Sequence, residues 1–250
     1  MEISFPILIL FFFIAVLAGC IDAIAGGGGL ITIPAMLACG IPPTAAIATN
    51  KLGGVAGTFS STLHFIRIGE VKPRKCMAMM AATFVGAIAG GFLLTRINSA
   101  QLAVLIPFLL IGFSAYFLFS PNIGALDSKQ VIPVALYTGL IAPSIGFYDG
   151  FFGPGTGAFL AISFVLLMGF NIVKATAHAK LLNFCSNLAA LIYFIGSGSI
   201  MVSLGLSMMC GQFVGGHIGA RLVVKNGKNL IKLVMVCVAL AVSAKILLHS

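Results

Sequence analysis

The sequence predicts an all-α polytopic membrane protein built from two inverted-topology repeats, each with a short, glycine-broken helix near the membrane midplane. Hydrophobic residues make up 60% of the 250 residues and charged residues only 8%, whereas charged residues make up about 25% of an ordinary soluble domain. The second half of the chain also repeats residues of the first half, and equivalent loops differ in positive charge. We therefore expect a single transmembrane domain over 1–250, with one repeat at 4–120 and the other at 131–250.

The repeat is carried by identical residues at a nearly constant offset. At an offset of 129 residues, the matching pairs are Lys51 and Lys180, Phe84 and Phe213, Gly86 and Gly215, and Gly90 and Gly219. Further upstream the offset is 127, and the matching pairs are Gly19 and Gly146, Asp22 and Asp149, Gly26 and Gly153, and Gly28 and Gly155. One gap of two residues therefore aligns both halves of the chain.

Five apolar segments follow one another in each half. They cover 4–24, 29–40, 44–66, 76–95 and 101–119 in the first half, and 131–151, 157–168, 172–195, 200–223 and 229–248 in the second. A membrane-spanning helix needs about 20 residues to cross a hydrocarbon core about 30 Å thick. The second segment of each half is too short to cross alone, and an odd number of segments inverts the second half. Because Glu2 replaces the positive start of a signal peptide, we expect the first segment to be retained.

The positive charges predict the same inversion. Four basic residues follow the third segment of the first half, namely Arg67, Lys72, Arg74 and Lys75. The equivalent loop 196–199 has no charge. The lightly charged turn around Arg96 corresponds to a basic stretch with Arg221, Lys225, Lys228 and Lys232. Because Lys and Arg accumulate in short cytoplasmic loops, we expect both basic regions in the cytoplasm and both termini outside it. Topology thus explains the net charge of +9, and no nucleic-acid partner is predicted.

Glycine runs precede both short segments, at 26–29 and 153–157. Irregular backbone at membrane depth occurs where it is buried in protein or lines a cavity, so these runs predict the break points of discontinuous helices. Each short helix would direct free N–H groups and the positive end of its dipole toward the midplane, which favours an anion. The alternative is that these glycines only permit close helix packing.

Few ionisable residues lie within the apolar segments, and we single out Asp22, Lys51, Asp149, Lys174, His178 and Lys180. Lys51 follows Asn50, and Asn183 lies three residues after Lys180 on the same helix face. Intramembrane charges usually line a pathway or pair with each other, so we expect the two lysines to supply positive charge and the asparagines to donate hydrogen bonds. The candidate substrate-binding residues are Gly26, Gly27, Gly28, Gly29, Asn50, Lys51, Gly153, Gly155, Thr156, His178, Lys180 and Asn183.

Two aspartates are candidates for coupling transport to a proton or sodium ion. They are Asp22 and Asp149, and the alternative is that they form Asp–Lys pairs that only hold helices together. The six cysteines show no C-x-x-C spacing, and we interpret them as small buried side chains. A sulfur-exchanging Cys20 is the minority hypothesis. With no metal-ligand spacing and no nucleophile elbow, neither a cofactor nor a metal site is expected, and the chain is not predicted to be an enzyme.

The stretches around these residues resemble the two signatures of the TauE/SafE sulfite exporter family. Among the branches of that family, their sequences are most similar to the YfcA-like one. The resemblance rests on GCIDAIAGGGG and TNKL in the first half and on GFYDGFFGPGTG and AHAKLLN in the second, and it extends over essentially the whole chain. It implies a permease of the bacterial inner membrane that carries small sulfur-containing anions, such as sulfite or organosulfonates. The candidate residues stand at positions that match those signatures.

The sequence therefore predicts an exporter of small sulfur-containing anions that works by alternating access. Two alternatives stay open, a cation-coupled uptake carrier for a related organic anion and an anion channel. A membrane-embedded enzyme or an accessory subunit is the remaining class. The anion, the direction of transport, the coupling ion and the oligomeric state, a homo-oligomer included, are not determined by the sequence.

Overall fold

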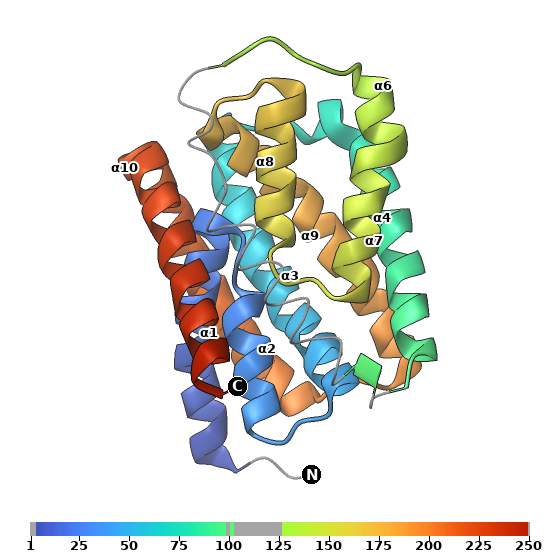
Figure 1. Ribbon diagram of the computed structural model, residues 1–250, viewed down its shortest axis with the longest axis vertical. Coiled ribbons are helices and arrows are strands. Elements are labelled where there is room, and N and C mark those ends of the chain that lie inside the picture. The colour runs from blue at the N-terminus through green and yellow to red at the C-terminus, as the bar shows by residue number, and fades with distance from the viewer. Residues whose placement is uncertain (1–3, 99–100, 103–126, 250) are drawn as a thin grey trace.

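The computed structural model describes residues 4–98, 101–102 and 127–249, and the regular structure within these ranges is helical (Figure 1). The first half contains four of the described helices, α1 (Phe5–Ala25), α2 (Gly29–Ala38), α3 (Pro43–Arg67) and α4 (Pro73–Arg96). The second half contains α6 (Val134–Leu136), the π-helical turn η1 (Tyr137–Ile141), α7 (Ala142–Phe151), α8 (Thr156–Met168), α9 (Ile172–Ser197) and α10 (Val202–His249). The all-α prediction is confirmed.

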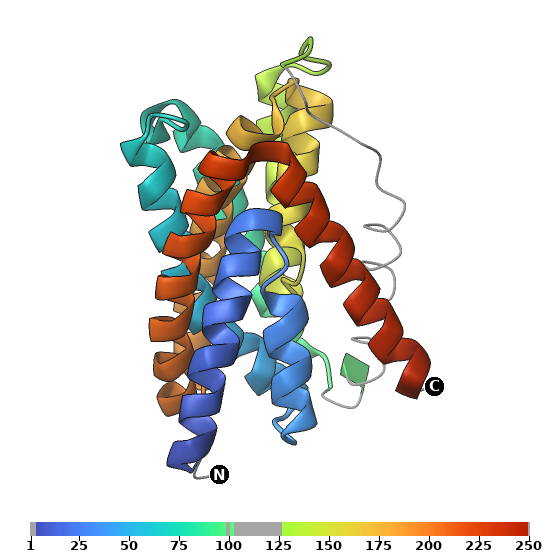
Figure 2. The same cartoon turned by 90° about the vertical axis from the view of Figure 1, so that its left-hand side faces the viewer.

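The predicted segments and the observed helices agree closely except in two places. Apart from its first two residues, the segment predicted at 101–119 lies outside the described residues. The single helix α10 covers both segments predicted at 200–223 and 229–248. Figure 2 shows that α10 rises along one side of the molecule, turns sharply and descends again, so that its two arms correspond to the two predicted segments.

The helices are long and apolar enough for a membrane protein. Among the described residues, α1, α4 and α9 meet the length and composition needed to cross a bilayer. Large apolar side chains on the outside of the molecule stay exposed, for example Phe5, Met77, Val85 and Ile195. A soluble protein of this size rarely exposes so much apolar surface. These faces are therefore suited to contact with lipid.

The helices begin and end at residues that suit those positions. Proline occupies the first helical position of α3 and α4, where its missing N–H leaves no bond unmade. The side chain of Asn171 caps α9 by accepting a hydrogen bond from the backbone N–H of Lys174 at 3.0 Å. Gly26 ends α1 with a left-handed φ of 74°, a conformation that glycine adopts without strain.

The two short helices start near the middle of the molecule and run in opposite directions. Figures 1 and 2 show α2 descending from the middle and α8 rising from it. Buried apolar side chains hold each of them, around Ile33 and Met36 on α2 and around Leu160 and Phe164 on α8. The N-termini of both helices are therefore close to the centre, where the sequence predicts the functional site.

Helix packing is the same in both halves at positions related by the predicted offsets. On α4, Gly86 lies against the carbonyl of Pro143 and the amide of Phe147 in α7. On α10, Gly215 lies against the carbonyl of Val16 and the amide of Cys20 in α1. Such close backbone approach needs glycine, as in other small-residue helix interfaces. The correspondence supports the interpretation of the chain as two repeats.

Both ends of the chain lie toward the same end of the molecule, since α1 begins and α10 finishes in the lower half of Figure 2. An arrangement with both termini on one side of a membrane requires this. Which side is cytoplasmic remains a prediction from the charges.

Candidate functional site

Two buried ion pairs join the halves of the molecule. The Nζ atom of Lys51 in α3 lies 2.9 Å from Oδ1 of Asp149 in α7, and the Nζ atom of Lys180 in α9 lies 2.9 Å from Oδ2 of Asp22 in α1. Both lysine side chains are only 1% exposed. Because an unpaired charge at membrane depth costs several kcal/mol, each lysine is tolerated there by its partner. The Asp–Lys pairs that the sequence left open therefore exist, and each crosses between the predicted repeats.

Both ammonium groups lie directly against the second glycine break, 153–157. A methyl group added to Gly153 would lie 2.7 Å from the Nζ atom of Lys51, and one added to Gly157 would lie 2.8 Å from the Nζ atom of Lys180. These glycines therefore leave just enough room for the lysine heads. The N-termini of α2 and α8 thus face a region that already contains two positive side chains.

The two breaks also touch each other. Gly26 lies against the backbone of Gly157 and Ala158, so closely that a side chain at this position would overlap the α8 backbone. Gly29 faces Pro154 at 3.2 Å and the Nδ2 atom of Asn50 at 3.4 Å, measured from the place of an added methyl group. Gly26 was predicted to bind substrate, but here it makes the backbone contact that holds the breaks together.

Two asparagine side chains present amide donors to the breaks. The Oδ1 atom of Asn50 accepts a hydrogen bond from the Thr32 hydroxyl at 2.6 Å, and the Oδ1 atom of Asn183 accepts one from the Nδ2 atom of Asn187 at 2.9 Å. With the oxygens engaged, each Nδ2 group is oriented as a donor. Neither group donates to a protein acceptor within the part of the chain that the structure describes.

The remaining glycines and Thr156 shape the breaks from within. The backbone N–H of Gly28 donates to Oδ1 of Asp22 at 3.3 Å, and Gly27 and Gly155 are buried. The hydroxyl of Thr156 donates to the carbonyl of Gly153 at 2.7 Å. Thr156 therefore stabilises the second break, and its hydroxyl hydrogen is already used there.

His178 does not join this group. Its ring packs against Phe164 and Phe170, with centroid distances of 5.5 Å and 4.8 Å, and its Nδ1 atom lies 2.8 Å from the carbonyl of Lys174. Two residues along a helix correspond to a rotation of about 200°, so His178 and Lys180 point to opposite sides of α9. The prediction that His178 contacts the substrate is not supported by this placement.

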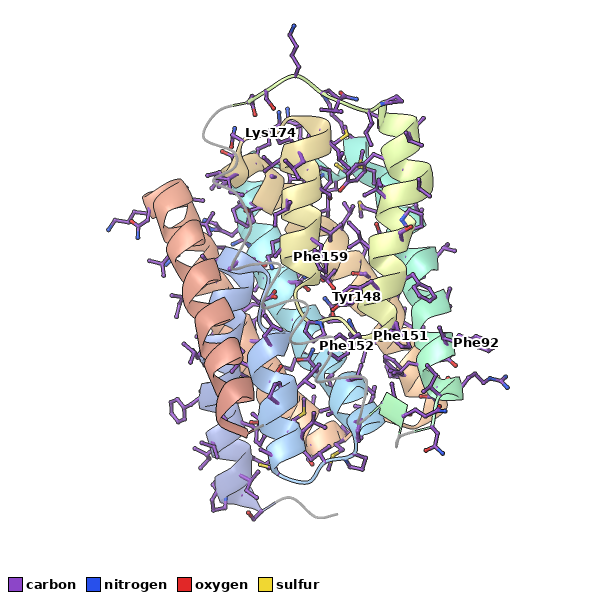
Figure 3. The ribbon with its side chains drawn as sticks, viewed as in Figure 1. Phe92, Tyr148, Phe151, Phe152, Phe159 and Lys174 are labelled. Atoms are coloured by element: carbon purple, nitrogen blue, oxygen red, sulfur yellow. The ribbon has the colours of Figure 1, made fainter. Side chains whose placement is uncertain are left out.

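Three polar residues of the site were missed by sequence reasoning. Thr32 and Asn187 orient the two amides, and the hydroxyl of Tyr148 donates to the carbonyl of Pro154 at 2.6 Å. Figure 3 shows Tyr148, Phe152 and Phe159 beside the loop between α7 and α8, and the Tyr148 ring lies 6.2 Å and 5.6 Å from the other two centroids. The sequence did contain a signal for two of these residues. Asn187 follows Asn183 by four residues and Thr32 follows Gly28 by four, so the two members of each pair are neighbours on one helix face.

The electrostatics of the site differ from the sequence expectation. The lysines were expected to supply positive charge, with Asp–Lys pairs as the alternative, and the two lysines and two aspartates form two pairs with no net charge. The remaining attraction for an anion comes from the two helix N-termini and the two amide donors. An anion that approaches a lysine therefore meets an ammonium group already bonded to a carboxylate, and it either shares the three N–H donors of that group or displaces the carboxylate.

Comparisons with known proteins identify the family of the chain. Residues 11–246 match the family described as sulfite exporter TauE/SafE. The chain is 46% identical over 242 residues to the probable membrane transporter protein YfcA of Escherichia coli K12, covering 96% of this chain and 89% of that protein. It is 42% identical over 245 residues to a probable membrane transporter protein of Haemophilus influenzae, covering 98% and 96%. A more distant relative is the probable membrane transporter protein YunE of Bacillus subtilis, 23% identical over 269 residues that cover 98% of this chain and 97% of that protein. The chain belongs to the TauE/SafE sulfite exporter family of membrane transporters.

Proposed function

We propose that the protein exports small sulfur-containing anions, such as sulfite or an organosulfonate, across the bacterial inner membrane by alternating access. The observation that carries the proposal is the meeting of two helix breaks, two lysines and two amide donors at one buried place. The match to a family described as sulfite exporters supports the choice of substrate class.

The chemistry of the site suits an oxyanion with several acceptor oxygens. Sulfite and sulfonate groups present three oxygens around one sulfur atom. The Nδ2 groups of Asn50 and Asn183 would donate to two of them, and the N-termini of α2 and α8 would contribute roughly half a positive charge each. A lysine head would then exchange its aspartate for the substrate, so that binding replaces one ion pair by another.

The burial of the ion pairs favours a carrier over an open channel. Both lysines are 1% exposed, and Asp149 is equally closed to solvent. A conducting pore lined by these groups would keep them hydrated, whereas alternating access requires a state in which the site is shut from both sides. The paired lysines and aspartates would hold the two halves together in that state.

The membrane potential supports export. A negative cell interior favours the exit of an anion by about 2.3 kcal/mol per elementary charge per 100 mV. Export of a singly charged sulfur anion therefore needs no second ion. Uptake against the same potential needs one.

One observation favours cation-coupled uptake as the second candidate. The Oδ2 atom of Asp149 is buried and has no hydrogen-bond partner in the described part of the chain. If a substrate anion replaces Asp149 as the ion-pair partner of Lys51, this carboxylate is left buried and unpaired. A proton or sodium ion would then neutralise it. In that case Asp149→Asn would abolish any stimulation of uptake by a pH or sodium gradient, and stimulation that persists in the variant would remove the coupling role.

The direct test is flux into liposomes that contain the purified protein, with sulfite, sulfoacetate, thiosulfate and sulfate as substrates. We expect saturable flux of a sulfur anion and counterflow, which a simple pore does not give. The variant Lys51→Met with Asp149→Asn removes one pair without leaving a buried charge and should lose flux. Lys174→Met is the matched control, because Lys174 lies on α9 over the Phe170 ring and outside the site. Folded protein that moves none of the anions would contradict the proposal.

A further inference from the structure

A second group of positive side chains lies away from the ion pairs, where the end of α3 meets α10. The two helices are in backbone contact, since Gly216 lies against the carbonyl of Gly57. His217 directly follows Gly216, and His64 lies two turns after Gly57; the rings of these histidines meet edge to face, with centroids 5.9 Å apart and an interplanar angle of 83°. Close helix packing thus forces the two imidazoles together.

Two arginines extend this pair, and neither has an acidic partner among the described residues. Arg67 follows His64 by three residues, and Arg221 follows His217 by four, so each arginine lies on the same helix face as the histidine of its helix. The charges of both arginines act on His64, and both side chains are exposed. The ion pairs found within the described residues are the two buried ones, so this quartet is not neutralised there by protein.

The surface next to the quartet is apolar and faces outward. Phe59 on α3 is 43% exposed, and Phe213 and Ile218 on α10 are each 45% exposed. Phe213 precedes His217 by four residues and lies on the same face of α10. The quartet therefore sits where an apolar, lipid-facing surface reaches its charged end.

The equivalent place in the other half has different chemistry. By the predicted offset, His64 corresponds to Tyr193 and Arg221 to Phe92, and the rings of these two residues meet edge to face at 6.5 Å between α9 and α4. An aromatic pair thus packs the same helix junction there. Packing alone does not require basic groups at this junction, and topology accounts for positive charge on this face but not for its convergence with two histidines beside an apolar surface.

We propose that His64, Arg67, His217 and Arg221 bind the phosphate headgroup of an anionic phospholipid, whose acyl chains lie on the adjacent apolar surface. Guanidinium groups bind phosphate through two parallel hydrogen bonds, and an imidazole donates an N–H in either protonation state. Basic pockets between transmembrane helices on the cytoplasmic side are suited to anionic headgroups, and the charge pattern predicts this face to be cytoplasmic. The site is independent of the proposed transport.

Native mass spectrometry of the purified protein in detergent tests the proposal. Phosphatidylglycerol and phosphatidylethanolamine with the same acyl chains are the probes. We expect selective binding of one phosphatidylglycerol molecule. Arg67→Gln with Arg221→Gln should weaken it about 25-fold, because one basic residue near an anionic surface contributes about fivefold. His64→Gln with His217→Gln should weaken it less.

The control removes two charges from the same face outside the quartet. Arg74→Gln with Lys75→Gln should leave the selective binding unchanged, and thermal unfolding verifies that each variant is folded. Equal losses in both arginine-containing double variants would reduce the effect to general surface charge and overturn the proposal. Displacement of the lipid by excess inorganic phosphate would instead indicate a site for a soluble anion. Equal binding of the two lipids would show no preference for an anionic headgroup and would overturn the proposal.

Discussion

The two buried ion pairs occupy equivalent positions of the predicted repeats but have different surroundings. In the pair of Lys180 with Asp22, both carboxylate oxygens are used, one by the ammonium group at 2.9 Å and one by the Gly28 N–H at 3.3 Å. In the pair of Lys51 with Asp149, only Oδ1 is used, and Oδ2 has no partner among the described residues. The Asp22 side chain is 15% exposed and that of Asp149 only 2%.

The backbone at the breaks differs in parallel with the carboxylates. Gly28, which precedes α2, is helical with a φ of −56°, whereas the equivalent Gly155, which precedes α8, is left-handed with a φ of 83°. The first break therefore directs an N–H at its own aspartate, and the second break does not. Repeated sequence has produced one well-satisfied carboxylate and one that depends on a single lysine. The second pair is thus the more sensitive of the two.

The largest expected effect is the loss of stability when the Asp149 carboxylate is removed. Asp149→Ala leaves Lys51 charged and buried, so we expect the free energy of unfolding to fall by about 3–5 kcal/mol. Asp22→Ala should cost less, because the Asp22 side chain is 15% exposed and that of Asp149 only 2%. Thermal unfolding of both variants in one detergent measures the difference.

A second substitution separates charge from packing in this prediction. Asp149→Ala combined with Lys51→Met should recover most of the lost stability, since no charge is then left unpaired. Equal destabilisation by Asp22→Ala and Asp149→Ala, or no recovery in the double variant, would remove the distinction between the two pairs.

The next effect concerns the contact that holds both breaks together. Gly26→Ala should destabilise the protein by about 2–3 kcal/mol, because the added methyl group strains the left-handed backbone and also overlaps the α8 backbone. Gly69→Ala is the control, since Gly69 has a φ of 82° but open space around it, and it should cost only about 1 kcal/mol. Equal losses would show that backbone strain alone matters and that the breaks do not support each other.

The comparison extends to substrate binding through the amides. Asn183→Ala should raise the KM for the transported anion about tenfold, because one hydrogen bond to a charged group contributes about 1.5 kcal/mol. Asn187→Ala should have a smaller effect, since Asn187 only orients the Asn183 side chain. The ratio of the two effects is measured by flux at graded substrate concentrations. A larger effect of Asn187 would place the anion elsewhere.

The parts of the site that sequence could predict are those set by local chemistry. Glycine runs before short apolar segments predicted the breaks. The repeat offsets identified Asp22 and Asp149, and likewise Lys51 and Lys180, as equivalent residues of the two halves. The offsets do not say which aspartate meets which lysine, because that depends on how the halves pack. Chain proximity also misled for His178, which is close to Lys180 in sequence but lies on the other side of α9.

The smallest expected effect concerns the second break. Within the described residues, this break lacks a counterpart of the hydrogen bond from the Gly28 N–H to Asp22 that stabilises the first break. The Tyr148 hydroxyl donates to the Pro154 carbonyl at 2.6 Å, and the equivalent residue in the first half is Ile21, which has no such group. Tyr148→Phe keeps the ring contacts and removes this hydrogen bond, so the free energy of unfolding should fall by about 1 kcal/mol. Hydrogen exchange should become faster in 153–157 and stay unchanged in 26–29. Equal changes in both breaks would mean that the hydroxyl acts on the whole site, because the breaks are in contact, and not on the second break alone.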